Sequence, residues 1–104
     1  MNNFKVIYKI LKYLEEAMDY SEPDYTPIKA NILELTGERW TQIIKMLLRE
    51  GYIEGVEIKQ YIRNTDTVTS FNPHITLKGL EYLEENSVMK KVAQAVTGIA
   101  QIIK

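Results

Sequence analysis

Cysteine is absent from this chain of 104 residues, and histidine occurs once. Without cysteine there are no disulfides, no thiolate ligands for a metal and no thiol nucleophile. The single histidine, His74, has no second histidine to complete a zinc pair and is interpreted as a surface or packing residue. Glycine-rich phosphate loops and the Gly-x-Ser-x-Gly pattern of serine hydrolases are also missing. We therefore expect no enzyme, no catalytic residues, no metal site and no cofactor.

Long apolar runs are missing as well. No stretch of ~20 apolar residues is present that could span a membrane. Three lysines interrupt the apolar residues of positions 1–14, which do not have the pattern of a signal peptide. Together with the missing cysteine, this predicts a cytoplasmic protein without a membrane span. The remaining composition, 45% hydrophobic and 26% charged, is typical of one globular domain with a modest core.

A basic excess is also lacking, because the formal net charge is −1. DNA-binding domains usually carry a clear positive charge, since the neutralisation of phosphates supplies most of their affinity. The charge is unevenly distributed, however. Residues 1–26 hold three lysines and five acids, whereas residues 87–104 hold three lysines and no acid. A role in nucleic-acid binding therefore depends on whether the folded surface segregates its basic side chains.

The most informative stretch, residues 36–53, reads as a helix that leads directly into a strand. Thr36 is placed as an N-cap, and Gly51 as the left-handed glycine that ends the helix. Trp40 begins an apolar stripe at helical spacing and is interpreted as a core residue. The outward face carries residue types that reach phosphates and base edges. These residues are Arg39, Thr41, Gln42, Lys45 and Arg49.

The periodicity of apolar residues predicts the other elements. Predicted helices cover residues 3–19, 27–35, 37–50, 77–86 and 88–103, and predicted strands cover 52–62 and 67–72. Thr26 and Pro27 open the second helix, a polar turn at 63–66 joins the strands, and Asn72–Pro73 ends the second strand. Thr76 is predicted as the N-cap of the helix at 77–86. The fold class is therefore α+β and mostly helical. Residues 1–86 are predicted to form a winged helix-turn-helix, with a three-helix core, a β-hairpin wing and an extra C-terminal helix.

The last segment, residues 87–104, is predicted to be an amphipathic helix that is too apolar to remain alone in water. Three interpretations are open: packing back onto the first helix, dimerisation, or contact with a membrane surface or another partner. A homodimer through this helix would use one face of it. The residues on that face are Val92, Val96, Ile99 and Ile103.

The order of elements resembles winged-helix DNA-binding domains. Residues 40–55 are similar to the end of the recognition helix in many small bacterial regulators. Together with Ile-Thr-Leu-Lys-Gly-Leu-Glu-Tyr-Leu at 75–83, they make the chain resemble the YjcQ-like family of small prophage-associated winged-helix proteins. The resemblance covers most of residues 3–86. It implies a DNA-binding type of fold.

The resemblance also implies roles for individual residues. The helix at 37–50 would be the recognition helix in the major groove, with Arg49 nearer the DNA backbone. The wing, residues 59–67, would touch the backbone or the minor groove. Its implied contact residues are Lys59, Tyr61, Arg63 and Asn64. Glu38 and Asp66 depart from the pattern, because each places an anion where phosphate would approach.

Two functions therefore remain open. The first is a phage- or prophage-type transcriptional regulator that binds double-stranded DNA. The second is a winged-helix module for protein–protein interaction that does not bind DNA. A basic stripe joining Arg39, Lys45, Lys59 and Arg63 on the folded surface would favour DNA. A mixed or acidic face would favour a protein partner.

Overall fold

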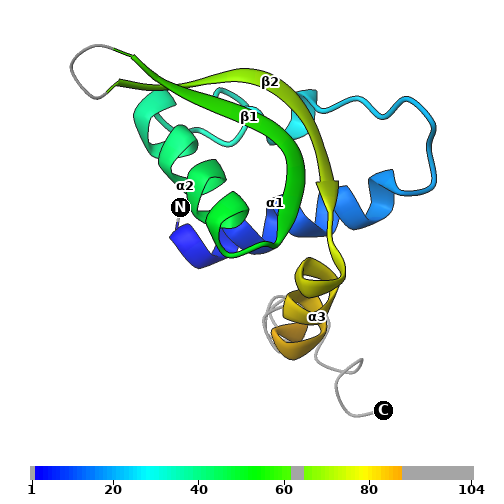
Figure 1. Ribbon diagram of the computed structural model, residues 1–104. Coiled ribbons are helices and arrows are strands. Elements are labelled where there is room, and N and C mark those ends of the chain that lie inside the picture. Colours follow the sequence, from blue (N-terminus) through cyan, green and yellow to red (C-terminus); the bar gives the residue numbers. More distant parts are fainter. Residues whose placement is uncertain (1, 62–64, 88–104) are drawn as a thin grey trace, which may run out of the picture.

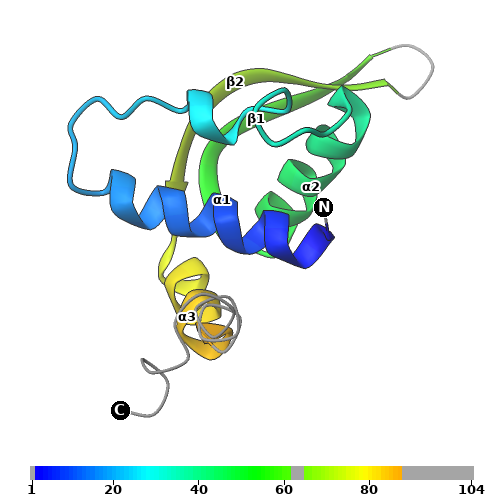
Figure 2. The same ribbon diagram turned by 180° about the vertical axis from the view of Figure 1, so that it is seen from behind.

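Three α-helices and one antiparallel hairpin make up the part of the chain that the computed structural model describes, residues 2–61 and 65–87. The α+β class is as predicted. The elements are α1 (Asn3–Ala17), the 3₁₀ helix η1 (Thr26–Ile28), α2 (Gly37–Arg49), β1 (Ile53–Tyr61), β2 (Thr65–Ile75) and α3 (Leu77–Glu85). The hairpin curves around α2, α1 crosses behind both, and α3 follows the end of β2 (Figures 1 and 2). The helix predicted at 88–103 lies outside the described residues.

Side-chain caps fix where the helices begin. The Asn2 Oδ1 atom accepts a hydrogen bond from the Phe4 N–H at 2.7 Å, and α1 starts at the next residue. Thr36 is the N-cap of α2, as predicted, and its Oγ1 accepts from the Arg39 N–H at 3.1 Å. Gly51 has φ +77°, so the predicted left-handed residue ends this helix.

The core lies between α1, α2 and the concave face of the hairpin. Trp40 is only 8% exposed, which confirms its interpretation as a core residue. Its neighbours in the core are branched aliphatic side chains that repeat at helical spacing on both helices. The core members are Val6, Ile10, Leu11, Leu14, Ile28, Leu33, Trp40, Ile43, Ile44, Leu47, Ile53 and Leu83.

The prediction of a helix at 27–35 is wrong. The chain forms η1, becomes extended at Lys29 (φ −82°, ψ 160°), makes one further turn, and closes at Glu34 with φ 59°. A tertiary contact explains the break. The Ile28 carbonyl accepts a hydrogen bond from the buried Trp40 indole Nε1 at 2.8 Å, and so turns toward α2. Pro27 also supplies no backbone donor.

The hairpin is longer than predicted, because β2 begins at Thr65 and continues to Ile75. Asp66 therefore lies in the strand, opposite Gln60, and not in the turn. Pro73 does not end the strand. It occupies a register shift opposite Gly55, where the missing proline N–H breaks no ladder bond. Gly55 has φ +86°, and a Cβ there would lie 2.2 Å from the Asn72 carbonyl oxygen.

Helix α3 is attached to the corner between α2 and β1. The predicted N-cap, Thr76, accepts from the Gly79 N–H at 3.1 Å, and its own N–H donates to the Tyr52 carbonyl at 3.1 Å. Gly79 is buried because the helix approaches this corner closely. A Cβ at Gly79 would lie 2.4 Å from the same Tyr52 oxygen.

Candidate nucleic-acid interface

The outward face of α2 is the centre of the predicted interface. Helical spacing places Glu38, Gln42, Lys45 and Arg49 opposite the buried stripe of this helix. Gln42 and Arg49 are exposed, whereas Lys45 is half-buried. The first turn therefore presents an acid and the last turn a base, which suits the helix dipole. Because Glu38 lies in the first turn, the N-terminal end of α2 is a poorer binding site for an anion.

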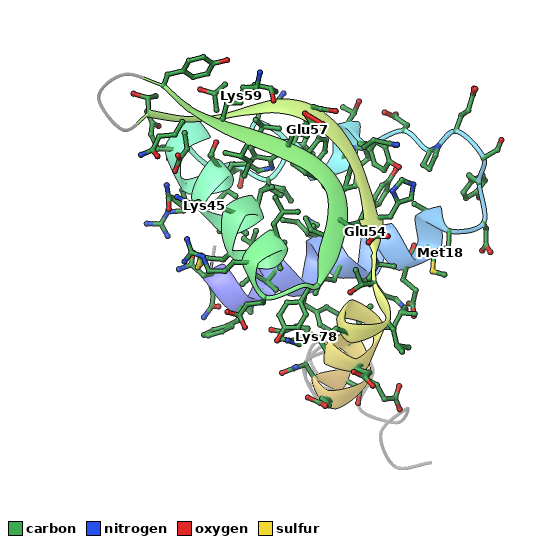
Figure 3. The ribbon with its side chains drawn as sticks, in the orientation of Figure 1. Met18, Lys45, Glu54, Glu57, Lys59 and Lys78 are labelled. Atoms are coloured by element: carbon green, nitrogen blue, oxygen red, sulfur yellow. The ribbon has the colours of Figure 1, made fainter. Side chains whose placement is uncertain are left out.

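Lys45 is joined to the hairpin by an ion pair that sequence reasoning missed. Its Nζ lies 2.8 Å from the Asp66 Oδ2, and the two side chains are 37% and 11% exposed. Asp66 was recognised as an anion near the wing, but the two residues are 21 positions apart, and only the curve of the hairpin brings them together. The positive charge of Lys45 is thus largely neutralised. Figure 3 places Lys45 on α2 and Lys59 on the hairpin above it.

Arg39 lies on the opposite flank of α2, beside the start of α1. Its guanidinium Nη1 donates to the Asn3 Oδ1 at 2.9 Å, and both residues are exposed. Both ribbon views show the N-terminal end of α1 beside α2 (Figures 1 and 2). Arg39 and Lys45 therefore border the exposed face of α2 on two sides. They do not form one continuous stripe.

The described wing residues are exposed on β1. Lys59 faces solvent next to Glu57 of the same strand, and Tyr61 is 54% exposed near the end of the strand. Their cross-strand partners, Thr67 and Thr65, are uncharged. The other two predicted wing residues, Arg63 and Asn64, lie outside the described residues. The described part of the wing thus contributes one base and one exposed aromatic ring.

A depression of about 350 Å³ separates α2 from the hairpin, and its lining combines predicted site residues of α2 with residues of β2 that were not predicted as site residues. Thr41 and Gln42 line it from α2, and Thr65 lines it from β2. Glu38 and Asp66 complete the lining. The depression between helix and wing is therefore polar and acidic, because the charged residues in its described lining are Glu38 and Asp66. Thr65 lies within the predicted wing, 59–67, but is not among the contact residues predicted for it.

Neither a metal site nor a membrane span is found in the described residues. Within 2–61 and 65–87, no three acidic or histidine side chains gather closely enough to hold a metal ion. None of the helices in that same part is long and apolar enough to cross a bilayer. The predicted dimer residues Val92, Val96, Ile99 and Ile103 lie outside the described residues.

Comparison with known proteins identifies the family. No solved structure matches the chain. A similar curated protein is the "Uncharacterized protein YjcQ" of Bacillus subtilis (strain 168), which is 32% identical over 104 residues and is matched over the full length of both chains. The family model described as "YjcQ protein" matches residues 8–102. The family resemblance drawn from the residues is thereby confirmed, and the chain belongs to the YjcQ family.

Proposed function

We propose that this protein is a small winged-helix DNA-binding protein of the regulator type. Helix α2 enters the major groove, and the β1–β2 hairpin contacts the flanking backbone. One observation carries the proposal: a capped helix with a polar outward face ends at a left-handed glycine and leads directly into a long hairpin. The hairpin returns to the start of that helix (Figure 1). This is the order in which winged helix-turn-helix domains present helix and wing.

The exposed basic side chains support the same orientation. Arg49 on α2, Arg39 on its flank and Lys59 on the hairpin are all exposed. Gln42 lies between the two arginines and offers an amide that can contact a base edge. With three exposed bases among the described residues of this surface, and with Glu38 and Asp66 nearby, the affinity should be modest and strongly weakened by salt.

A second candidate function, binding of a protein partner, is supported by the acidic lining of the depression between α2 and the hairpin. A phosphate backbone approaching this depression meets the carboxylates of Glu38 and Asp66. A polypeptide carries donors of its own and would meet no such penalty. The two candidates therefore differ in how binding responds to salt.

The first test is a titration of a labelled random DNA duplex by fluorescence anisotropy, from low to about physiological salt. The Arg49→Ala variant should weaken binding and reduce the slope of log K against log salt by about one, because one phosphate contact is lost. Lys78→Ala removes the same charge from α3 and serves as the control.

Equal effects of the two substitutions would contradict the placement of α2 in the groove. No binding of the wild-type protein at low salt would contradict the DNA proposal as a whole. Protein-partner binding would then be the better account of this surface.

A further inference from the structure

An open groove lies at the end of α1 that is far from the candidate DNA interface. It consists of two adjoining depressions of about 430 and 360 Å³, which share Ala17, Tyr20 and Pro23 in their linings. Helix α1 and the loop that follows it form one wall. The end of β2 forms the other, through Pro73 and Ile75.

The groove exposes apolar side chains that a folded domain normally covers. Met18 is 61% exposed and Tyr20 is 70% exposed, although both directly follow the buried end of α1. Figure 3 shows Met18 at the far end of α1, away from α2. Large exposed side chains that line a concave surface are typical of a binding site.

The rim of the groove is acidic, because Glu16, Glu22 and Asp24 line it. From Glu15 to Asp24 the chain carries five acids, and no basic residue occurs between Lys12 and Lys29. Of these acids, Glu15 is paired with Lys12 at 2.7 Å. The Asp24 carboxylate accepts hydrogen bonds from Thr26, including one from the Thr26 N–H at 3.0 Å, and these bonds lower the pKa of Asp24 below its ordinary value.

The last 17 residues of the chain, 88–104, have the complementary composition. They are mostly apolar, and they carry three lysines and no acid. They begin shortly after α3, which packs on α1, the helix that forms the groove. As a helix at 1.5 Å per residue, this segment would extend about 25 Å, which is longer than α1 itself. Its length and its starting point therefore let it reach the groove of its own chain.

We propose that residues 88–104 dock in this groove of the same chain. Their apolar side covers Met18 and Tyr20, and Lys90 and Lys91 face the acidic rim. The covalent connection favours the same copy, because a tethered segment is present at an effective concentration of about millimolar. This inference does not depend on DNA binding. Of the interpretations that the sequence left open for residues 88–104, called the tail from here on, it selects packing onto the same chain.

The test is hydrogen exchange in the full-length chain, read on the amides of residues 14–25. Val96→Asp places a charge on the apolar side of the tail and should accelerate exchange at these amides by about tenfold or more, as expected when a local cover opens. Gln94→Asp adds the same charge on the polar side and should leave the exchange rates unchanged. If both variants exchange like the wild type, the tail does not cover the groove.

An exchange of charges between the tail and the rim of the groove gives a second test. It compares two variants, so it does not depend on the fold of one variant alone. Lys90→Glu with Lys91→Glu should open the groove, and adding Glu16→Lys with Asp19→Lys should restore protection. Without this restoration, the proposed orientation is wrong. Protection in the wild type should also be independent of protein concentration. Protection that increases with concentration, together with a dimer mass by light scattering, would mean that the tail docks on a second copy and would overturn the proposal.

Discussion

Lys45 and Asp66 determine how much positive charge α2 can offer to a ligand. The 2.8 Å ion pair holds the Lys45 ammonium against the hairpin, and the 11% exposure of Asp66 shields its carboxylate from water. A phosphate that approached here would have to compete with this carboxylate for the same lysine. The pair also ties the wing to the helix, so it fixes the distance between the two proposed DNA contacts.

Asp66→Asn should therefore increase DNA affinity. The substitution removes one negative charge from the proposed interface and releases Lys45, so the salt slope should become steeper by about one. The free energy of unfolding should fall by only about 0–1 kcal/mol, because Lys45 is more than a third exposed and solvent weakens the pair. Anisotropy and urea unfolding measure the two quantities.

Glu81→Gln removes the same charge from the exposed side of α3 and is the control for Asp66→Asn. An increase of affinity in both variants would indicate a general effect of net charge. Unchanged affinity in Asp66→Asn would mean that no phosphate approaches this part of the hairpin.

Single residues also show what could be predicted from sequence. The caps at Thr36 and Thr76, the left-handed Gly51 and the buried Trp40 depend on neighbours within one helical turn. All of them were predicted correctly. The Lys45–Asp66 pair depends on the curvature of the hairpin, which no local pattern specifies, so Lys45 was predicted as a free groove contact.

At the scale of elements, the segment between α1 and α2 shows tertiary structure overriding a local pattern. Residues 27–35 have helical spacing, yet the chain is extended at Lys29. The Trp40 indole takes the Ile28 carbonyl that a helix would need for the N–H four residues later. The first half of the predicted helix-turn-helix is thus reduced to two short turns that follow the surface of α2.

Trp40→Phe should destabilise the protein by about 1–3 kcal/mol, because the buried Ile28 carbonyl loses its donor. Tyr25→Phe is the control. The Tyr25 ring contacts Phe71, as the Trp40 ring does. The substitution removes only the Tyr25 hydroxyl, whose 3.4 Å contact with Asn72 is long and solvent-exposed, so little stability should be lost. Urea unfolding measures both. Equal stability of the two variants would mean that the indole hydrogen bond does not determine the course of this segment.

At the scale of the whole molecule, the charge is segregated although its sum is close to zero. The acid-rich stretch from Glu15 to Asp24 lies at one end of α1, and the contact between Asn3 and Arg39 lies at the other. The net charge of −1 therefore overstates how acidic the α2 end is, because five acids lie in the stretch from Glu15 to Asp24. Composition alone could not reveal this, because it depends on which ends of the elements meet.

The whole fold also depends on the close approach of α3 to the corner after α2. Gly79→Ala should cost about 1–3 kcal/mol of unfolding free energy, because the new Cβ would overlap the Tyr52 carbonyl and displace the helix. Gly37→Ala is the matched control. It stands in the first turn of α2 with nothing within 4 Å of its Cβ position, so it should leave stability unchanged or slightly increased.

Denaturant unfolding of these two variants tests whether α3 is part of the cooperative unit. If Gly79→Ala unfolds at the same urea concentration as Gly37→Ala, then α3 contributes little to the stability of the domain. A single shifted transition in Gly79→Ala would show that α1, the α2 corner and α3 unfold together.

The two-stranded sheet has a consequence for association between molecules. Within the described residues β1 and β2 pair only with each other, so each is an edge strand on its outer side, and an exposed edge is a template for strands of other chains. The register shifts at Gly55 and beside Glu57, and the proline at position 73, bend and interrupt these edges. The register shifts and the proline, which the sequence suggests as interruptions of a strand, thereby disfavour pairing with strands of other chains. A variant with a straightened hairpin would aggregate more readily, even with its fold unchanged.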